Sequence, residues 1–416
     1  MARTEKPANG RRGNVLDQIE GPELFIGLVG AVGTNLKLVS DVLSDELRKV
    51  RYEPHELRLS AVLAGVPKFN HLGTLKGGPE DVRVNTYMDA GDELRRTAKS
   101  GDALALLSVM AVRDHREQTQ GDENKPIARR VYIFNSLKHP NEIRTLRQIY
   151  GRAFCVLSVY SPRSERIDAL AEAIARSRHG FEKDQYRKQA EQLVERDKRS
   201  GDDEFGQNVR DAFPLADFFV RASDRAELKK DVKRFVELLF NHPFHTPTLD
   251  EYALYIARAA ALRSADLSRQ VGAVITNEDG DILAVGCNEV PKAGGGSVWP
   301  GDKHDYRDFQ VGTDKSAMMK QEMVAEVFQR LSEAGWLSAS KADSPINRLV
   351  DEALYGKNAV FEDARIANII EYGRINHAEM AALMDAVRRG VSVKGATLYC
   401  TTFPCHMCAR HIWVQE

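Results

Sequence analysis

Two short motifs near the end of the chain constrain its fold most, because their side chains have to meet at one point. The first is His377-Ala-Glu379 and the second is Pro404-Cys-His-Met-Cys408. One imidazole and two thiolates suit a zinc ion that keeps its fourth position open. Cys405 and Cys408 are three residues apart, so both face the same way at the start of a helix. The sequence therefore predicts a zinc site formed by His377, Cys405 and Cys408.

Glu379 lies two residues after His377 and need not be a ligand. Its carboxylate can take a proton from an activated water and pass it on, which is general acid–base catalysis. A purely structural zinc site is the alternative, and it would need a fourth protein ligand. The candidates for that ligand are Cys400, His406 and His411. Glu379 and Pro404 favour the catalytic interpretation over the structural one.

The spacing H-x-E…P-C-x-x-C is the signature of zinc-dependent nucleobase deaminases. The residues before it narrow the resemblance. Arg263-Ser-Ala-Asp-Leu-Ser-Arg-Gln-Val-Gly-Ala-Val-Ile275, followed by Gly286-Cys-Asn288 and Pro291, resembles deoxycytidylate deaminases. That resemblance implies that Asn288 hydrogen-bonds the sugar of a nucleotide. It also makes Arg263 and Arg269 candidates for binding the phosphate.

Two features keep the substrate assignment open. The arginines could instead form surface ion pairs with Asp266 or Glu251. Ala381 stands where the monophosphate enzymes often have Asn, which leaves the number of phosphates undecided.

The segment 291–375 is a long insertion with several His, Asp and aromatic residues. It could close over a nucleotide or form a surface excursion, as most loops do.

A glycine-rich turn in the N-terminal half lies between an expected strand and an expected helix. This is the setting of a phosphate-binding P-loop. On the pattern G-x-x-x-x-G-K-[ST], however, Asn35, Leu36 and Lys37 stand where Gly, Lys and Ser or Thr belong. Backbone N–H groups can still bind phosphate, so we expect a degenerate nucleotide-binding turn, with a purely structural turn as the alternative. Its candidate binding residues are Gly30, Gly33, Thr34, Asn35 and Lys37.

Alternating apolar runs and helical patterns predict an α/β protein with a P-loop NTPase-like parallel sheet in its first domain. The expected strands of this domain are 23–30, 131–134, 153–160 and 216–220. The expected helices are 36–50, 81–96, 103–112, 141–150 and 227–240. The charge-rich stretch 176–210 favours a solvated helix with a flexible loop. A mobile lid over a phosphate site is the alternative.

The segment 241–248 contains two prolines and marks the expected domain boundary. We expect a disordered tail over 1–20, a P-loop kinase-like domain over 21–240 and a cytidine deaminase-like α/β/α domain over 249–416. The last should contain helices 249–263 and 377–389, and strands 271–277, 281–288 and 396–402. A helical piece is expected near 320–334 within the insertion. The resemblance implies a sheet of about five strands. Because only three are visible, we expect an incomplete domain in a truncated chain.

Composition excludes several classes. The formal net charge is −1, which argues against a nucleic-acid backbone as the main partner. No apolar run is long enough to span a membrane, and the polar N-terminus lacks the apolar core of a secretory signal. Five cysteines in no regular framework favour a reducing compartment, so we expect a cytoplasmic protein.

The pairing of both domains, with Ser136-Leu-Lys-His-Pro140 and Thr248-Leu-Asp-Glu-Tyr252, resembles the bacterial anti-phage dCTP deaminases from about residue 20 onward. The resemblance implies zinc-dependent deamination of free dCTP and dCMP to dUTP and dUMP, which depletes cytosine deoxynucleotides during infection. It also implies repression by a small RNA or activation by a ligand. We further expect a homo-oligomer. A nucleic-acid cytidine deaminase and a nucleotide-sensing regulatory protein with a degenerate P-loop are the alternatives.

Overall fold

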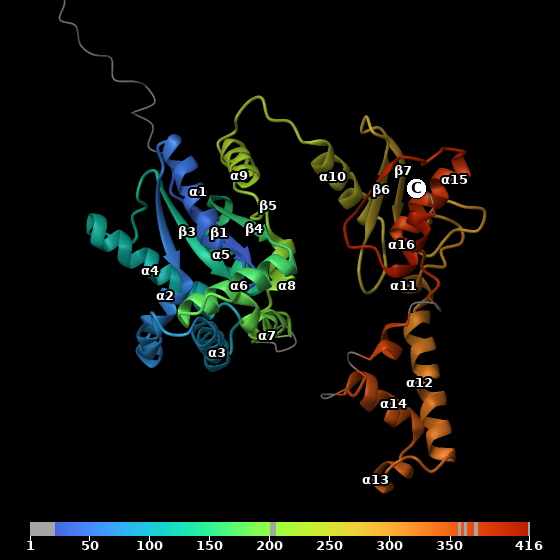
Figure 1. The fold of residues 1–416 in the computed structure, drawn as a ribbon. Helices are drawn as coiled ribbons and strands as arrows, with labels where there is room; N and C mark the ends of the chain where they lie inside the picture. The colour runs from blue at the N-terminus through green and yellow to red at the C-terminus, as the bar shows by residue number, and fades with distance from the viewer. Residues whose placement is uncertain (1–20, 200–204, 357–358, 362–363, 370–372, 415–416) are drawn as a thin grey trace, which may run out of the picture. The chain divides into compact units, whose positions relative to one another are not determined.

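The computed structural model describes residues 21–199, 205–356, 359–361, 364–369 and 373–414. The chain divides into two compact units, Met1–His245 and Thr246–Glu416 (Figure 1). The division falls inside the proline-containing segment 241–248. The tail expected over 1–20 lies outside the described residues.

The first unit is built on a parallel five-stranded sheet with the order β2-β3-β1-β4-β5. Its strands are β1 Leu24–Gly30, β2 Glu53–Arg58, β3 Arg130–Leu137, β4 Phe154–Tyr160 and β5 Phe218–Arg221. The central strand β1 is buried along nearly its whole length, as expected for a strand covered on both faces. The α/β class and the parallel sheet predicted from the sequence are confirmed.

Helices cover both faces of this sheet. Helices α1 Leu36–Lys49 and α9 Arg225–Leu239 share one apolar cluster with residues such as Ile26 and Leu28 of β1. The alternate residues Phe25 and Val29 belong to the cluster on the other face. The helices contributing to that second cluster are α2 Leu59–Ala64, α3 Glu80–Ala98, α4 Ala103–Gln120, α5 Pro140–Tyr150 and α8 Val209–Ala212.

The charge-rich stretch forms a helix, α7 Arg187–Arg199, which packs on α6 Arg163–Ser177. Ala190, Leu193 and Val194 are buried in that contact. The prediction of a simply solvated helix is therefore wrong for one face of α7, because apolar residues at helical spacing are hidden among the charges. The loop expected beyond it includes residues 200–204, which lie outside the described residues.

The second unit has an antiparallel sheet with the order β7-β6-β8 over its described residues. Its strands are β6 Gly272–Thr276, β7 Ile282–Cys287 and β8 Thr397–Cys400. Helices α10 Leu249–Ala261 and α15 Ala378–Arg389 cover opposite faces. A Cβ added at Gly272 would lie 1.9 Å from Ala257 O on α10, and one at Gly286 would lie 2.3 Å from Ala378 O on α15. These glycines let both helices pack directly on the strands.

The insertion between β7 and α15 is more helical than the sequence predicts. It contains α11 Asp308–Val311, α12 Lys315–Glu333, α13 Ala339–Ala342 and α14 Ile346–Tyr355. Helix α14 buries Leu349, Val350 and Ala353 and packs against α12 (Figure 1). The last helix, α16 His406–Trp413, follows β8. None of the described helices is both long enough and apolar enough to cross a membrane.

Candidate metal centre

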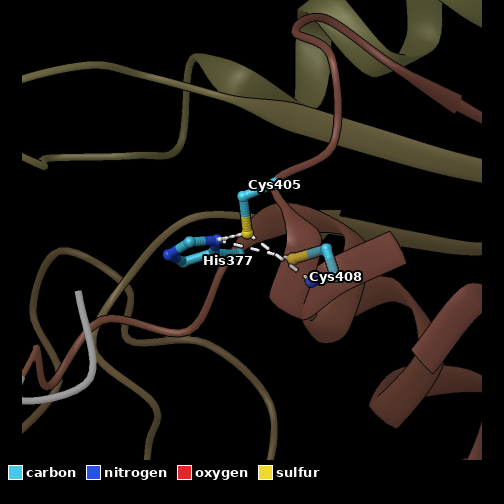
Figure 2. Close-up of side chains that lie close together, drawn as sticks. All are labelled: His377, Cys405 and Cys408. Carbon is cyan, nitrogen blue, oxygen red and sulfur yellow. Dashed lines mark hydrogen bonds between the residues drawn. The ribbon is translucent and has the colours of Figure 1, made fainter. Parts of the chain in front are cut away.

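Three side chains from two helix N-termini meet in the second unit. His377 is the N-cap residue of α15, Cys405 is the N-cap residue of α16, and Cys408 lies in the first turn of α16. The Nδ1 atom of His377 lies 3.4 Å from the Sγ atom of each cysteine (Figure 2). All three ligand atoms lie within 4.8 Å of one another. A tetrahedral zinc ion with usual bond lengths separates such atoms by roughly 3.5–3.8 Å, so zinc fits this group.

The local sequence explains why the two thiols converge. The Sγ atom of Cys405 accepts a hydrogen bond from the backbone N–H of Cys408 at 3.5 Å, which caps α16. Pro404 lies one residue before this cap, where its missing N–H costs no helical hydrogen bond. The helix start therefore positions both cysteines to share one ion.

The side chains considered as a fourth ligand do not join this group. Within the described part of the chain, the cluster of metal-binding side chains that includes His377 consists of these three residues. His406 and His411 are exposed. Cys400 instead hydrogen-bonds Glu379, and burial together with that carboxylate raises the pKa of the Cys400 thiol to about 11. Three protein ligands are the set of a catalytic zinc rather than a structural one.

Glu379 lies in the first turn of α15 with only 3% of its surface exposed. It sits against the thiols of Cys400 and Cys408. Burial, and next the negative charge of Glu379, raise the pKa of Cys408 above its usual range. A carboxylate buried beside two thiols is unfavourable unless a cation compensates for it. This donor set is therefore suited to a divalent cation.

A cavity of about 370 Å³ is lined by residues of β7, of α15 and of the loop that follows β7. Its lining includes Asn376, which directly precedes His377, but it does not include the three metal-binding residues. Arg263 and Arg388 bring two guanidinium groups to it. The guanidinium of Arg263 lies 3.9 Å from the ring centroid of Trp299, within reach of a cation–π interaction. This cavity therefore offers two guanidinium groups to an anionic ligand beside α15.

The other predicted substrate residues have different surroundings. Asn288 is 7% exposed, and its Oδ1 accepts from Val271 N at 2.6 Å. Its Nδ2 donates to Arg269 O at 2.7 Å and to Asp266 Oδ2 at 3.1 Å. The amide of Asn288 thus holds the loop that leads into β6. The side chain of Arg269 is exposed, while Asp266 accepts from the backbone N–H of Ser268 and Arg269.

The glycine-rich turn lies in the first unit, between β1 and α1. Gly33 has a φ of +86°, which favours glycine, and a Cβ there would lie 2.7 Å from Arg166 O. Asn35 caps α1 by accepting from Leu38 N at 3.0 Å. Lys37 pairs with Asp41 on the exposed side of the same helix. Thr34 keeps its hydroxyl buried without a hydrogen bond to any described residue.

Two further residues reach this turn, and neither belongs to the P-loop pattern. Lys138 at the end of β3 donates from Nζ to Gly30 O at 2.8 Å. Asp197 of α7 accepts from Val32 N at 2.8 Å. Strand β3 lies beside β1, and the carboxyl ends of neighbouring parallel strands share one edge. A lysine directly after a buried strand therefore indicates a binding residue at this edge of the sheet. The sequence does not show which strand lies beside β1, so Lys138 could not be assigned to the turn from the sequence.

Comparisons with known proteins agree with this description of the second unit. Residues 247–415 match the family described as cytidine and deoxycytidylate deaminase zinc-binding region. The second unit is therefore similar to a deaminase-type zinc-binding domain. This match covers less than half of the 416 residues.

One curated relative and two solved structures show similarity to parts of the chain. The chain is 24% identical over 163 residues to a probable deoxycytidylate deaminase of Drosophila melanogaster, a match that covers 39% of this chain and 53% of that protein. The chain thus spans about half the length of this relative. A shikimate kinase from Bacteroides thetaiotaomicron is 15% identical with a TM-score of 0.28, covering 52% of this chain and 98% of the kinase. A gluconokinase from Sinorhizobium meliloti 1021 is 14% identical with a TM-score of 0.27, covering 54% and 98%.

Proposed function

We propose that the second unit hydrolyses the exocyclic amine of free cytosine deoxynucleotides, converting dCTP and dCMP to dUTP and dUMP with release of ammonia. The observation that carries this proposal is the convergence of His377, Cys405 and Cys408 beside the buried carboxylate of Glu379. The match of residues 247–415 to the deaminase family supports the same reaction. By the resemblance of the whole chain, the role of the reaction is to deplete cytosine deoxynucleotides during phage infection.

The chain's own residues have separate tasks in this reaction. Zinc, when bound, supplies a Lewis acid that lowers the pKa of water to about 7. Glu379 takes one proton from the attacking water and delivers it to the ring nitrogen N3; it then takes the second proton from the hydroxyl formed at C4 and delivers it to the amine, which leaves as ammonia as the C4 carbonyl forms. Its burial keeps the proton transfers away from bulk water and strengthens its electrostatic effect on the reacting atoms. His377 and the two cysteines hold the metal and leave one position open.

A free nucleotide is favoured over a nucleic-acid strand for two reasons. The cavity beside α15 measures about 370 Å³ and is of the size that holds a single small ligand. The formal net charge of −1 does not favour binding along a phosphate backbone. We assign the phosphates to Arg263 and Arg388, which line this cavity. Asn288 contributes by holding the loop between Arg263 and β6.

For the first unit we propose a second function, which is binding of a phosphate-bearing ligand. A cavity of about 510 Å³ adjoins the glycine-rich turn and is lined by Arg163, Arg166 and Arg210. It lies at the carboxyl ends of β1 and β4, the edge at which open parallel sheets usually bind ligands. Cation-rich lining at such an edge suits a nucleotide or another phosphate ester.

The test is a zinc-loaded preparation of the full chain incubated separately with dCTP, dCMP, CTP, cytidine and a cytosine-containing single-stranded oligonucleotide. Ammonia and the uracil product are measured for each. Deamination of dCTP or dCMP, lost in Glu379→Ala while zinc is retained, is the expected result. Glu322→Ala, which removes an exposed carboxylate of α12, is the matched control and should keep full activity. Turnover of the oligonucleotide alone would contradict the assignment to free nucleotides.

A further inference from the structure

Helix α7 places the carboxylate of Asp197 against the glycine-rich turn of the first unit. The carboxylate lies where the turn would bind an anion. We propose that Asp197 is an internal substitute for a phosphate: it closes the turn, and a phosphate-bearing ligand must displace it to bind. This inference rests on the proposed phosphate binding by the first unit and names how that binding is regulated.

The contacts of Asp197 are those that a phosphate oxygen would make. Its Oδ2 accepts from the backbone N–H of Val32 at 2.8 Å. Its Oδ1 lies 3.7 Å from the Nζ atom of Lys138. A backbone N–H in a glycine-rich turn and a nearby lysine ammonium are the groups that hold phosphates in such turns. A ligand and Asp197 therefore compete for the same donors.

Lys138 supplies the cation that the turn itself lacks. The lysine that follows the turn, Lys37 of α1, is committed to Asp41 on the exposed side of α1. Lys138 instead enters from the end of β3 and donates to Gly30 O at 2.8 Å. Its backbone N–H donates to the Oε2 atom of the buried Glu142 at 2.7 Å, which fixes its position. The displaced lysine of the P-loop pattern is thus replaced from another strand.

Two buried polar atoms at this site have no hydrogen-bond partner among the described residues. Asp197 is 6% exposed, and its Oδ1 makes no hydrogen bond with a described residue. The buried hydroxyl of Thr34 is equally without a hydrogen-bond partner in the described part of the chain. Both residues line the cavity of about 510 Å³ that also contains Arg163 and Arg210. A polyphosphate has more oxygens than one carboxylate and could satisfy these groups together.

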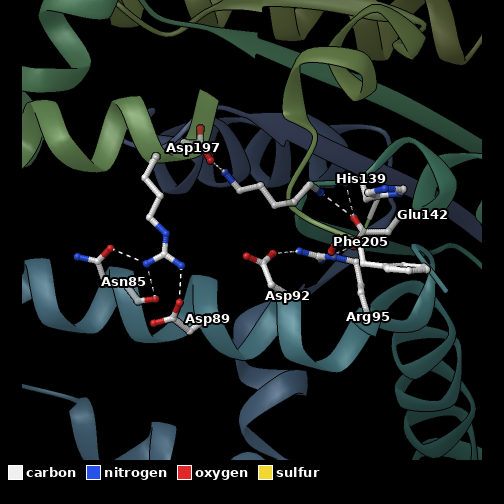
Figure 3. Close-up of polar contacts among 10 residues, drawn as sticks. Asn85, Asp89, Asp92, Arg95, His139, Glu142, Asp197 and Phe205 are labelled. Carbon is white, nitrogen blue, oxygen red and sulfur yellow. Dashed lines mark hydrogen bonds and ion pairs between the residues drawn. The ribbon is translucent and has the colours of Figure 1, made fainter. Parts of the chain in front are cut away.

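A second set of contacts, made by the residue next to Asp197, also holds α7 in place. Arg196, the neighbouring residue on α7, donates to Asn85 Oδ1 at 2.8 Å and to Asp89 Oδ1 at 2.5 Å on α3 (Figure 3). The same helix α3 carries Arg95, which pairs with Glu142 at 3.5 Å. Displacement of Asp197 removes one polar anchor of α7 and leaves those of Arg196 on α3 and of Arg187 on Asp168 of α6. Ligand binding should therefore loosen α7.

An alternative role for Asp197 is that of a permanent structural cap. A buried carboxylate that accepts from Val32 N satisfies a donor that would otherwise be costly to bury. On that account, removal of the charge destabilises the turn and does not improve phosphate binding. The competition account thus predicts tighter phosphate binding when the charge is removed, and the structural account predicts no gain in affinity.

The deciding experiment measures binding of ATP and of inorganic pyrophosphate to the zinc-loaded full chain by calorimetry. Asp197→Asn is compared with the wild type and with Glu191→Gln, which removes another carboxylate from α7. We expect at least tenfold tighter binding for Asp197→Asn and no change for Glu191→Gln. Asp197→Ala, with unfolding temperatures for every variant, provides a second comparison; if it fails to fold, the isosteric Asn variant decides. ATP should also increase deuterium exchange in α7 of the wild type.

Equal affinities for the wild type and Asp197→Asn would overturn the proposal, as would an absence of binding in both, because either result leaves Asp197 as a structural cap. Deaminase activity is measured separately as ammonia release from dCTP. A chain without deaminase activity can still show the competition, and an active deaminase can fail to show it. The two proposals therefore fail independently.

Discussion

The metal centre of the second unit and the glycine-rich turn of the first differ in where the opposite charge comes from: a bound ligand at the first site and a side chain of the protein at the second. At the metal centre, a buried carboxylate lies beside two thiols, and the three ligand atoms are spaced for a cation. At the turn, the donors Val32 N and Lys138 already face a carboxylate of the protein. The first site needs a ligand to become electrostatically balanced, whereas the second is balanced by its own chain and binds only by competition.

The largest effect should come from removing a metal-binding side chain. Cys408→Ser replaces a thiolate with a hydroxyl that binds zinc far less well. We expect zinc content and deaminase turnover to fall together to the level of the chelated protein. Cys155→Ala, at a half-buried position on β4, should retain both. Metal analysis measures the zinc content, and ammonia release measures the turnover. A fully active Cys408→Ser variant would show that Cys408 does not hold the metal.

The next effect distinguishes the two lysines near the turn. In the Asp197→Asn background, Lys138→Ala removes a charge-assisted contact worth roughly 1.5–3 kcal/mol and should weaken ATP binding by about tenfold or more. Lys37→Ala in the same background should leave the affinity unchanged, because its ammonium faces Asp41. Calorimetry checks both variants. Equal losses for the two would mean that Lys37 leaves Asp41 and binds the ligand.

A smaller effect tests whether the cavity beside α15 holds the substrate phosphates. Arg263→Ala should raise the KM for dCTP by about tenfold and change kcat little, since it removes a binding contact and no proton carrier. Arg269→Ala, an exposed side chain on the same loop, is the matched control. Steady-state kinetics separate the two parameters. An unchanged KM in Arg263→Ala would place the phosphates elsewhere.

The smallest effect concerns packing. A methyl group at Gly286 would lie 2.3 Å from backbone atoms of α15, so Gly286→Ala should cost about 1–3 kcal/mol of stability in the second unit. Gly73→Ala in the first unit meets nothing within 4 Å and should be nearly neutral. Denaturant unfolding monitored in both variants checks the difference. Similar stabilities would show that α15 shifts easily away from the sheet.

Local spacing explains what the sequence predicts well. His377 and Glu379 lie in one motif and Cys405 and Cys408 in another, so their chemistry can be recognised without the fold. Likewise β1 and α1 follow from an apolar run and a helical pattern. The hairpin of β6 and β7 follows from the turn around Gly280, which has a φ of +87°.

The features missed depend on contacts between distant segments. Strand β2 has the sequence EPHELR, whose charges and proline are typical of a loop, and it becomes a strand because it pairs with β3. Asp197 is 165 residues away from its partner Val32. Lys138 reaches the turn only because β3 lies beside β1. No local pattern contains this information.

Zinc titration into the metal-free full chain, with dCTP as substrate, tests the central claim most directly. The account predicts that ammonia and dUTP form in equal amounts, and that the rate rises with added zinc up to one ion per chain and then stays constant. Deamination by the metal-free chain, or no product when each chain holds one zinc ion, would contradict it.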